Sequence, residues 1–410
     1  MANWITKGAG LVLVFVTVCS SWLLHPANAQ ERPPDEDLRS MIEQLTTHHG
    51  PASKVAFADH PSVTTPCRML PADMVGSRDS DSKSFPVLIE RQRGEVKSLF
   101  AKLSRISVDA DGAGRSYHPD DPLGENVCGV SSNSPKQVCA LDNVTNAGMR
   151  LFHGSTRLKK SKDPSDSQGF LSNWRDLWPL IRDEKLTPLS LAAIVGSDGP
   201  RQYNLFYWPE RHLTFAFNTE IVPPTRRGYP CRYGRRSEYA GYFLSSTTLV
   251  NERREADHEC PTNLFMNSAV VPFFVIPAEK LDGIGLGDLA IGFLATPTSL
   301  RVVYGIVGDI GPFNHFGEGS IAFNKTLLGV QKEIANGRDV DSLDIDFASA
   351  DQPHGPDASL SVLLLGGTRK LLNGNFNSPN IRRVGQAQLK QWRAAASVKE
   401  RVRACLAVAP

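Results

Sequence analysis

A short apolar run that ends in a glycine-rich loop limits the fold more than any other part of the chain. The run, Leu300–Val307, contains β-branched residues over the length of a strand, which indicates a buried β-strand. It ends at Gly308-Asp309, and the glycines between there and Ile321 permit tight turns. Two acids, Asp309 and Glu318, therefore lie at the two ends of one loop, each beside a strand. They are either a pair for general acid–base chemistry, or a turn cap and a solvated charge.

The first 29 residues have the pattern of a secretory signal peptide. Lys7 precedes the apolar run Leu11–Val18, and small residues at Ala27-Asn-Ala29 form a cleavage site. No later run is apolar for long enough to span a bilayer. We therefore expect a secreted protein, periplasmic or extracellular, with no membrane association after cleavage.

The cysteines predict disulfide bonds. Cys19 lies in the signal peptide, and an even number of cysteines in the rest of an exported chain favours disulfides over metal binding. We expect the pairs that are close in sequence to form and the remaining two cysteines to pair by default, although other pairings stay possible. No two cysteines have the spacing of a zinc site, so we expect no metal and no cofactor. The expected pairs are Cys128–Cys139, Cys231–Cys260 and Cys67–Cys405.

The net charge excludes a global preference for nucleic acid. The chain has 45 Lys and Arg against 43 Asp and Glu, a formal charge of +2. One basic cluster stands out around Cys231, and it is either a solvated face or an anion site. No nucleic-acid-binding module accompanies it. The cluster consists of Arg226, Arg227, Arg232, Arg235 and Arg236.

An acidic segment follows Ser107. A calcium loop that begins at Asp109 would have Asp111 and Asp120 at ligand positions, but Ala113 occupies another of these positions and offers no ligand. The segment is therefore a solvated loop or a wall that faces a substrate, and a calcium site is the less favoured alternative. Its acids are Asp109, Asp111, Asp120, Asp121 and Glu125.

Many short apolar runs separated by turn residues, with few long helices, predict a mainly-β (α+β) fold. We expect a single β-barrel domain with helical additions and a C-terminal helix. Signatures of metalloproteases, serine hydrolases and nucleotide-binding proteins are missing. The expected divisions are a signal peptide at 1–29, a loosely packed segment at 30–85, a catalytic domain at 86–370 and a helical extension at 371–410. The expected strands are 85–90, 191–195, 203–208, 213–217, 242–249, 270–276, 289–294, 300–307 and 359–365, and the expected helices are 37–45, 94–104, 173–182 and 386–404.

Several blocks in order along the chain resemble the bacterial branch of glycoside hydrolase family 75, the chitosanase family. The resemblance covers residues from about 108 to 365, with insertions at 124–140 and 222–262. Its active-site block corresponds to Gly308-Asp309 and Gly317-Glu-Gly-Ser-Ile-Ala322. The other blocks are Asp109-Ala-Asp-Gly112, Tyr117-His-Pro-Asp120, Leu141-Asp-Asn143, Asn146-Ala-Gly148, Gly241-Tyr-Phe-Leu-Ser-Ser-Thr-Thr-Leu249, Val271-Pro-Phe-Phe-Val-Ile-Pro277 and Leu286-Gly-Asp-Leu-Ala290.

The resemblance implies a chitosanase, an endo-acting hydrolase that cleaves β-1,4 glucosamine linkages with inversion. Asp309 and Glu318 match its two essential acids. Because Asp309 follows the buried strand, it is our candidate for the general acid. An acidic wall would attract the polycation chitosan, whereas the arginine cluster would repel it from a shared groove. The expected substrate-binding residues are Asp109, Asp111, Tyr117, His118, Asp120 and Asp142.

A weaker resemblance concerns the fold alone. The strand, Asp309, Gly-Pro-Phe and the apolar residues that follow are similar to the double-psi β-barrel of expansin-like proteins. Two other functions stay open. One is another glycan-cleaving enzyme of the cell wall, directed at peptidoglycan, and the other is a non-catalytic carbohydrate-binding barrel. In each case we expect a monomer that binds no nucleic acid.

Overall fold

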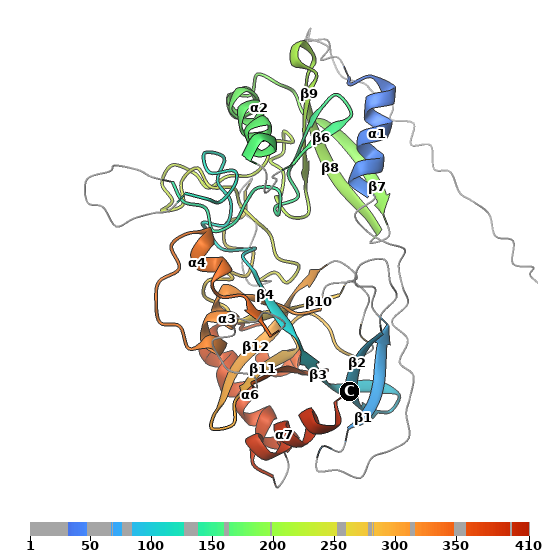
Figure 1. The fold of residues 1–410 in the computed structure, drawn as a ribbon, viewed down its shortest axis with the longest axis vertical. Helices are drawn as coiled ribbons and strands as arrows, with labels where there is room; N and C mark the ends of the chain where they lie inside the picture. The colour runs from blue at the N-terminus through green and yellow to red at the C-terminus, as the bar shows by residue number, and fades with distance from the viewer. Residues whose placement is uncertain are drawn as a thin grey trace, which may run out of the picture.

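The computed structural model shows two lobes, one above the other in Figure 1. The lower lobe contains a ten-stranded sheet and the C-terminal helices, and the upper lobe contains a five-stranded sheet flanked by α1 and α2. The predicted signal peptide lies outside the described residues. The structure describes residues 32–46, 67, 69–75, 84–126, 138–159, 164–196, 199–251, 260–277, 281, 283–311, 316–347, 358–393 and 396–409.

The ten-stranded sheet is built from segments at both ends of the chain. Most neighbours are antiparallel, but β10 pairs with β12 in parallel, and so does β13 with β4. In hydrogen-bonded order the strands are β1 (Leu70–Val75), β2 (Ser84–Gln92), β3 (Glu95–Leu103), β15 (Ser359–Leu365), β11 (Leu289–Ala295), β12 (Leu300–Gly311), β10 (Phe273–Pro277), β13 (Glu318–Ser320), β4 (Arg105–Asp109) and β14 (Ile345–Asp346).

Strands β3 and β4 are consecutive, and Ser104 alone separates them. Strand β3 pairs with β15, and β4 pairs with β13. The strand order from β3 to β4 therefore starts and ends on two strands that are neighbours in the sequence. The hydrogen-bonded order of the described strands nevertheless runs open, from β1 to β14. The structure thus confirms a sheet-rich fold with helical additions, but no closed barrel is seen among the described strands.

The predicted helix at 94–104 is wrong, because these residues form β3. Val96, Leu99, Phe100 and Leu103 match a helical spacing, and all four are buried. A strand that is covered on both faces also reads as a nearly continuous apolar run. Leu99 faces one hydrophobic cluster and Phe100 the other, so both faces of β3 lie in the core.

The core on one side of this sheet forms around Phe323, from helix α3 (Ile321–Leu328). The ring is fully buried, and three glycines make room for it. A Cβ on Gly292 would come within 2.7 Å of the ring, and one on Gly305 or Gly319 within 2.9 Å. The apolar residues from Ile321 onward thus form a helix, capped by Ser320, although their character also fits a strand.

Two helices cover the other side of the sheet. The predicted single helix at 386–404 is wrong, because α6 (Ser378–Arg393) ends and α7 (Val398–Val408) starts anew. Ser397 caps α7 in a capping box with Glu400, which explains the break. Cys405 on α7 forms the predicted disulfide with Cys67.

The upper lobe is an antiparallel sheet of order β6-β5-β9-β8-β7. Met41 and Leu45 of α1 are buried against it, and Trp174 and Trp178 of α2 stack in its aromatic core. The expected 30–85 segment thus contributes α1 to this lobe and β1 to the other. The elements are α1 (Asp35–Thr46), β5 (Arg150–His153), β6 (Thr156–Leu158), α2 (Pro164–Arg182), β7 (Leu189–Gly196), β8 (Gly199–Trp208), η1 (Pro209–Arg211) and β9 (Leu213–Asn218).

The two lobes are joined by loops rich in hydrogen bonds. The predicted strand at 242–249 is wrong: these residues form a loop with isolated bridges. The predicted disulfide Cys231–Cys260 is confirmed. Cys139 is disulfide-bonded, and its expected partner Cys128 lies outside the described residues.

The short helices α4 (Gly337–Asp341) and α5 (Arg369–Leu372) complete the lower lobe. In the described part of the chain, no helix has both the length and the apolar character to cross a membrane.

Candidate active site

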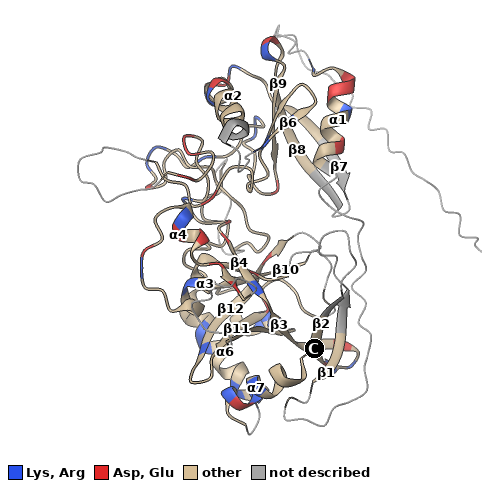
Figure 2. Cartoon of the chain, viewed as in Figure 1, with Lys and Arg blue, Asp and Glu red and all other residues tan. Residues whose placement is uncertain are grey.

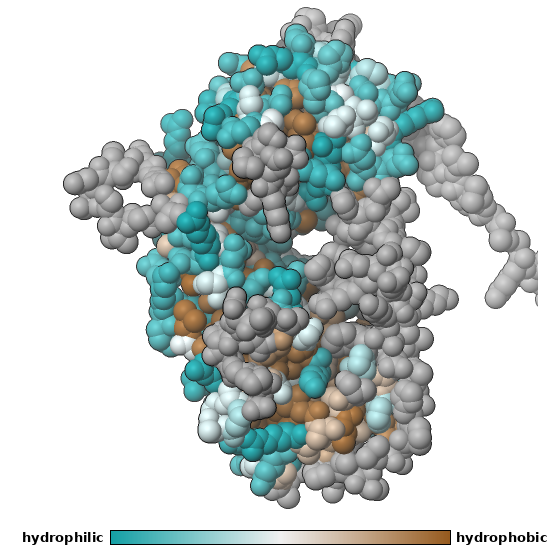
Figure 3. Space-filling view, viewed as in Figure 1, coloured by the Kyte–Doolittle hydropathy of each residue, from teal (hydrophilic) through white to brown (hydrophobic). Residues whose placement is uncertain are grey.

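A cleft of about 1140 Å³ lies between the lobes. The surface is hollowed there in Figure 3, and acidic segments lie near β4 and α4 in Figure 2. Eight carboxylates line the cleft, against two arginines, Arg105 and Arg150. Acidic residues therefore outnumber basic ones in the cleft, although the whole chain is nearly neutral. The acids are Asp109, Asp111, Asp142, Glu220, Asp309, Glu318, Asp341 and Asp344.

Asp309 lies within β12, near the end of the strand, and is buried. One carboxylate oxygen, Oδ1, accepts hydrogen bonds from the Thr248 backbone N–H at 3.0 Å and the Thr248 hydroxyl at 2.5 Å. It also accepts one from the Ile310 N–H at 2.7 Å. Burial raises the pKa of Asp309 to about 6, against the lowering effect of these hydrogen bonds. The group can therefore exchange a proton in weakly acidic solution.

Glu318 begins β13, two strands away from Asp309. Both residues align with the same residue of β10, Val275, which lies between them. Because aligned residues on neighbouring strands point to the same face, both carboxyl groups face the cleft that all three residues line. Two strand spacings place the Cα atoms of the two acids about 10 Å apart.

The acidic segment enters the centre of the cleft through β4. Asp109 accepts a hydrogen bond from the backbone N–H of Asp111 at 2.8 Å, and Asp111 accepts one from the Tyr117 hydroxyl at 2.8 Å. Burial raises the pKa of Asp109 well above its usual range, and the charges of Asp111 and Asp309 add to this. Burial and Asp309 likewise raise the pKa of Asp111, and burial raises that of Tyr117. The empty cleft thus disfavours full ionisation of its central acids.

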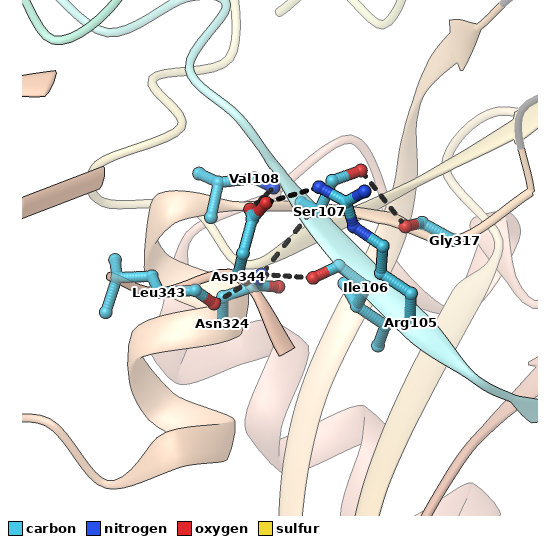
Figure 4. Close-up of polar contacts among 8 residues, drawn as sticks. All are labelled: Arg105, Ile106, Ser107, Val108, Gly317, Asn324, Leu343 and Asp344. Carbon is cyan, nitrogen blue, oxygen red and sulfur yellow. Dashed lines mark hydrogen bonds and ion pairs between the residues drawn. The ribbon is translucent and has the colours of Figure 1, made fainter. Parts of the chain in front are cut away.

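Hydrogen bonds hold β4 in register with the loop before Glu318 (Figure 4). The Ser107 N–H donates to Gly317 O at 2.9 Å, and Asp344 accepts from the Val108 N–H at 2.9 Å and from Arg105 at 2.6 Å. A Cβ on Gly317, whose φ is +126°, would lie 2.8 Å from the Arg105 carbonyl oxygen. Only glycine allows this close approach of the two backbones.

Asn324, on α3, fixes the same strand from below. Its side-chain amide donates to Leu343 O at 3.1 Å and to the carbonyls of Ile106 and Ser107 at 3.4 Å (Figure 4). The residue is fully buried, so its Asn-Lys-Thr sequence is not accessible to glycosylation in the folded protein.

Four of the six predicted substrate-binding residues line the cleft: Asp109, Asp111, Tyr117 and Asp142. His118 and Asp120 are not among the residues that line it. His118 is buried against Tyr242 and its Nδ1 accepts from the Asp120 N–H, while burial lowers its pKa to about 4. His118 is therefore a neutral structural residue.

The arginine cluster does not line the cleft. Arg227 pairs with Glu184, and Arg232 lies over the ring of Trp178 in the upper lobe. The sequence leaves open whether this cluster repels a cationic polymer from the cleft. Because the cluster lies outside the lining of the cleft, it does not do so there.

Sequence reasoning missed the partners of the acids. Thr248, which binds Asp309, belongs to the polar run Ser245–Thr248, and that run was the available signal. Glu220, Asp341 and Asp344 join the cleft from distant segments that carry no motif. Among the described residues, no group of three or more His, Cys, Asp or Glu is arranged to hold a metal ion.

No family model matches this chain, and no curated protein matches it. Assignment of a function therefore rests on the geometry of the cleft and on the sequence blocks quoted above.

Proposed function

We propose that the protein is a secreted, monomeric inverting glycoside hydrolase that cleaves the β-1,4 linkages of chitosan, as its resemblance to the chitosanase family implies. The observation that carries the proposal is the cleft, in which eight carboxylates and two arginines meet between the lobes. A groove with this charge attracts a polycation and repels acidic polymers.

The central acids give a second argument for a cationic substrate. Burial and mutual repulsion raise the pKa of Asp109 and Asp111, so both carboxyl groups tend to keep protons in the empty cleft. Ammonium groups of bound glucosamine units would supply the missing positive charge and favour the ionised forms. A neutral polymer such as chitin offers no such compensation.

In the proposed reaction Asp309 is the general acid and Glu318 is the general base. Asp309 gives its proton to the glycosidic oxygen as the C1–O bond breaks, and Glu318 takes a proton from the water that attacks C1 from the opposite side. Inverting enzymes hold their two carboxyl groups roughly 6.5–9.5 Å apart. Two carboxyl groups on the same face of the sheet, with Cα atoms about 10 Å apart, are compatible with this range.

We also propose that the strands around the site belong to a double-psi-like barrel. The return of the strand row to the segment that contains β3 and β4, and the two parallel pairs β10–β12 and β13–β4, support this fold. The fold by itself assigns no activity.

Incubation of the secreted, disulfide-bonded protein with chitosan, chitin and peptidoglycan tests the function. We expect new reducing ends from chitosan, and proton NMR should show the α-anomer as the first product. Release of reducing ends from peptidoglycan alone would show that the substrate is this cell-wall glycan and not chitosan. No release from any of the three would favour a binding protein.

Thr248→Val should move the alkaline limb of the pH profile of kcat/KM upward by about one to two units. The hydroxyl stabilises the ionised form of Asp309, so its removal raises the pKa of that acid further. A charge-assisted hydrogen bond of about 1.5–3 kcal/mol corresponds to a shift of this size. Since a general acid must be protonated, activity would persist to higher pH. Thr248→Ser keeps the hydroxyl and should keep the profile, and a downward shift in Thr248→Val would contradict the role of Asp309 as acid.

A further inference from the structure

A third carboxylate, that of Asp109, joins Asp309 and Glu318 on the strands that form the floor of the cleft. Asp309 is on β12 and Glu318 on β13, with β10 between them, and β4 follows on the far side of Glu318. In the parallel pair β13–β4, Glu318 aligns with Ser107 and Ser320 aligns with Asp109. Asp109 thus lies one strand over from Glu318 and two residues, about 7 Å, along it.

Strand alternation turns Asp109 toward the same face as Glu318. Aligned residues share a face, and so do residues two apart, so Glu318, Ser107 and Asp109 all point into the cleft that they line. Glu318 therefore has Asp309 on one side and Asp109 on the other. The space for a sugar lies over the strands between Asp309 and Glu318, and a water that lies over Glu318 at the edge of this space faces Asp109 as well.

The position of Asp109 is rigid. Asp344 and Gly317 hold β4 through the N–H groups of Val108 and Ser107. Oδ1 of Asp109 accepts from the Asp111 N–H, and among the described residues its other oxygen, Oδ2, has no hydrogen-bond donor. One oxygen is thus fixed by the backbone, and the other can accept a hydrogen bond from a molecule in the cleft.

We propose that Asp109 is a third catalytic residue, whose carboxylate holds the attacking water together with Glu318. This inference rests on the proposed function. The water donates one O–H to Glu318 and the other to Asp109. As its oxygen forms the bond to C1, the first proton passes to Glu318, the C1–O bond to the leaving sugar breaks, and Asp309 protonates the leaving oxygen. Asp109 keeps its hydrogen bond to the new hydroxyl group, so atoms and charges balance.

Two reagents distinguish a residue that holds the attacking water from a residue that protonates the leaving group. Azide is a nucleophile that needs no base, so it can replace the water where the water is no longer held. A dinitrophenyl leaving group departs without being protonated, so a substrate that carries it does not need the general acid. A group that holds the water should respond to the first reagent and not to the second.

The experiment compares Asp109→Ala, Glu318→Ala and Asp309→Ala on chitosan oligomers and on the dinitrophenyl β-glycoside of a glucosamine oligomer, with and without azide. We expect Asp109→Ala to lower kcat on chitosan oligomers about 100-fold. Azide should restore turnover in Asp109→Ala and Glu318→Ala, with an α-glycosyl azide as product. The dinitrophenyl leaving group should restore turnover in Asp309→Ala only.

Asp176→Asn serves as a control, since this acid pairs with Arg211 on the surface of α2. If wild type and control cleave chitosan and Asp109→Ala keeps full activity, the catalytic role of Asp109 is contradicted while the proposed function stands. A loss in Asp109→Ala that azide does not restore, or that the dinitrophenyl group does restore, also overturns it. An inactive wild type overturns both proposals. Azide rescue itself shows that the variant is folded, and the isosteric Asp109→Asn should show the same loss.

Discussion

Asp309→Asn and Glu318→Gln should each lower kcat on chitosan oligomers by about 10³-fold, because each removes one of the two proton transfers of the proposed reaction. Both substitutions keep the size of the side chain. In Asp309→Asn the carboxamide oxygen could still accept the hydrogen bonds from Thr248, so the local structure should persist. The release of reducing ends, measured at saturating substrate, gives kcat for each variant.

The double variant tests whether the two acids act in one reaction. Groups that work as a unit are not additive, so the double variant should be only slightly slower than the slower single variant. Asp176→Asn, a surface acid of α2, should retain wild-type kcat. Near-identical circular dichroism spectra would show that the variants fold. Full activity in both single variants would remove Asp309 and Glu318 from the mechanism.

The strand and loop around the two acids could be predicted because their signals are local. The apolar run Leu300–Val307 forms most of β12, and Glu318 lies at a strand margin as expected. The loop between them could not be compared, since residues 312–315 lie outside the described part. The disulfide Cys67–Cys405 followed from elimination rather than from a structural signal.

The arrangement of the cleft could not be predicted, because it depends on pairings between distant segments. Glu318 meets Ser107 on one side and Val275 on the other, and no sequence pattern links these three residues. The sequence predicts that the acidic segment is a solvated loop or a wall that faces a substrate. The parallel pairing of β13 with β4 places Asp109 on the same face of the sheet as Glu318, one strand away. The register of a strand, and not its composition, made this difference.

Errors in secondary structure have a similar cause. Strand β3 has buried apolar residues on both faces, because it lies between two hydrophobic clusters, and their spacing also fits a helix. The segment after Glu318 is apolar too, yet Ser320 caps a helix there through the Phe323 N–H at 3.1 Å. Its N-cap was the available signal.

Phe323→Ala should lower the free energy of unfolding by about 3–5 kcal/mol, the usual cost of removing a fully buried aromatic ring. The site cannot collapse easily around the cavity, because Gly292, Gly305 and Gly319 have no side chains that could move into it. Phe274, whose ring centroid lies 5.8 Å away, would lose its aromatic neighbour. Urea unfolding with the disulfides intact, followed by fluorescence and circular dichroism, measures the change.

The exposed Leu371→Ala on α5 is the matched control, and its unfolding free energy should stay within about 0.5 kcal/mol of wild type. A loss below about 1 kcal/mol in Phe323→Ala would mean that the ring does not fill the core as described. Because α3 follows directly on the strand that starts with Glu318, the same variant should also lose activity. Removal of the ring loosens the support of β13, so kcat should fall more than the folded fraction does. Equal falls in kcat and in folded fraction would show that the position of Glu318 depends on β10 and β4 alone.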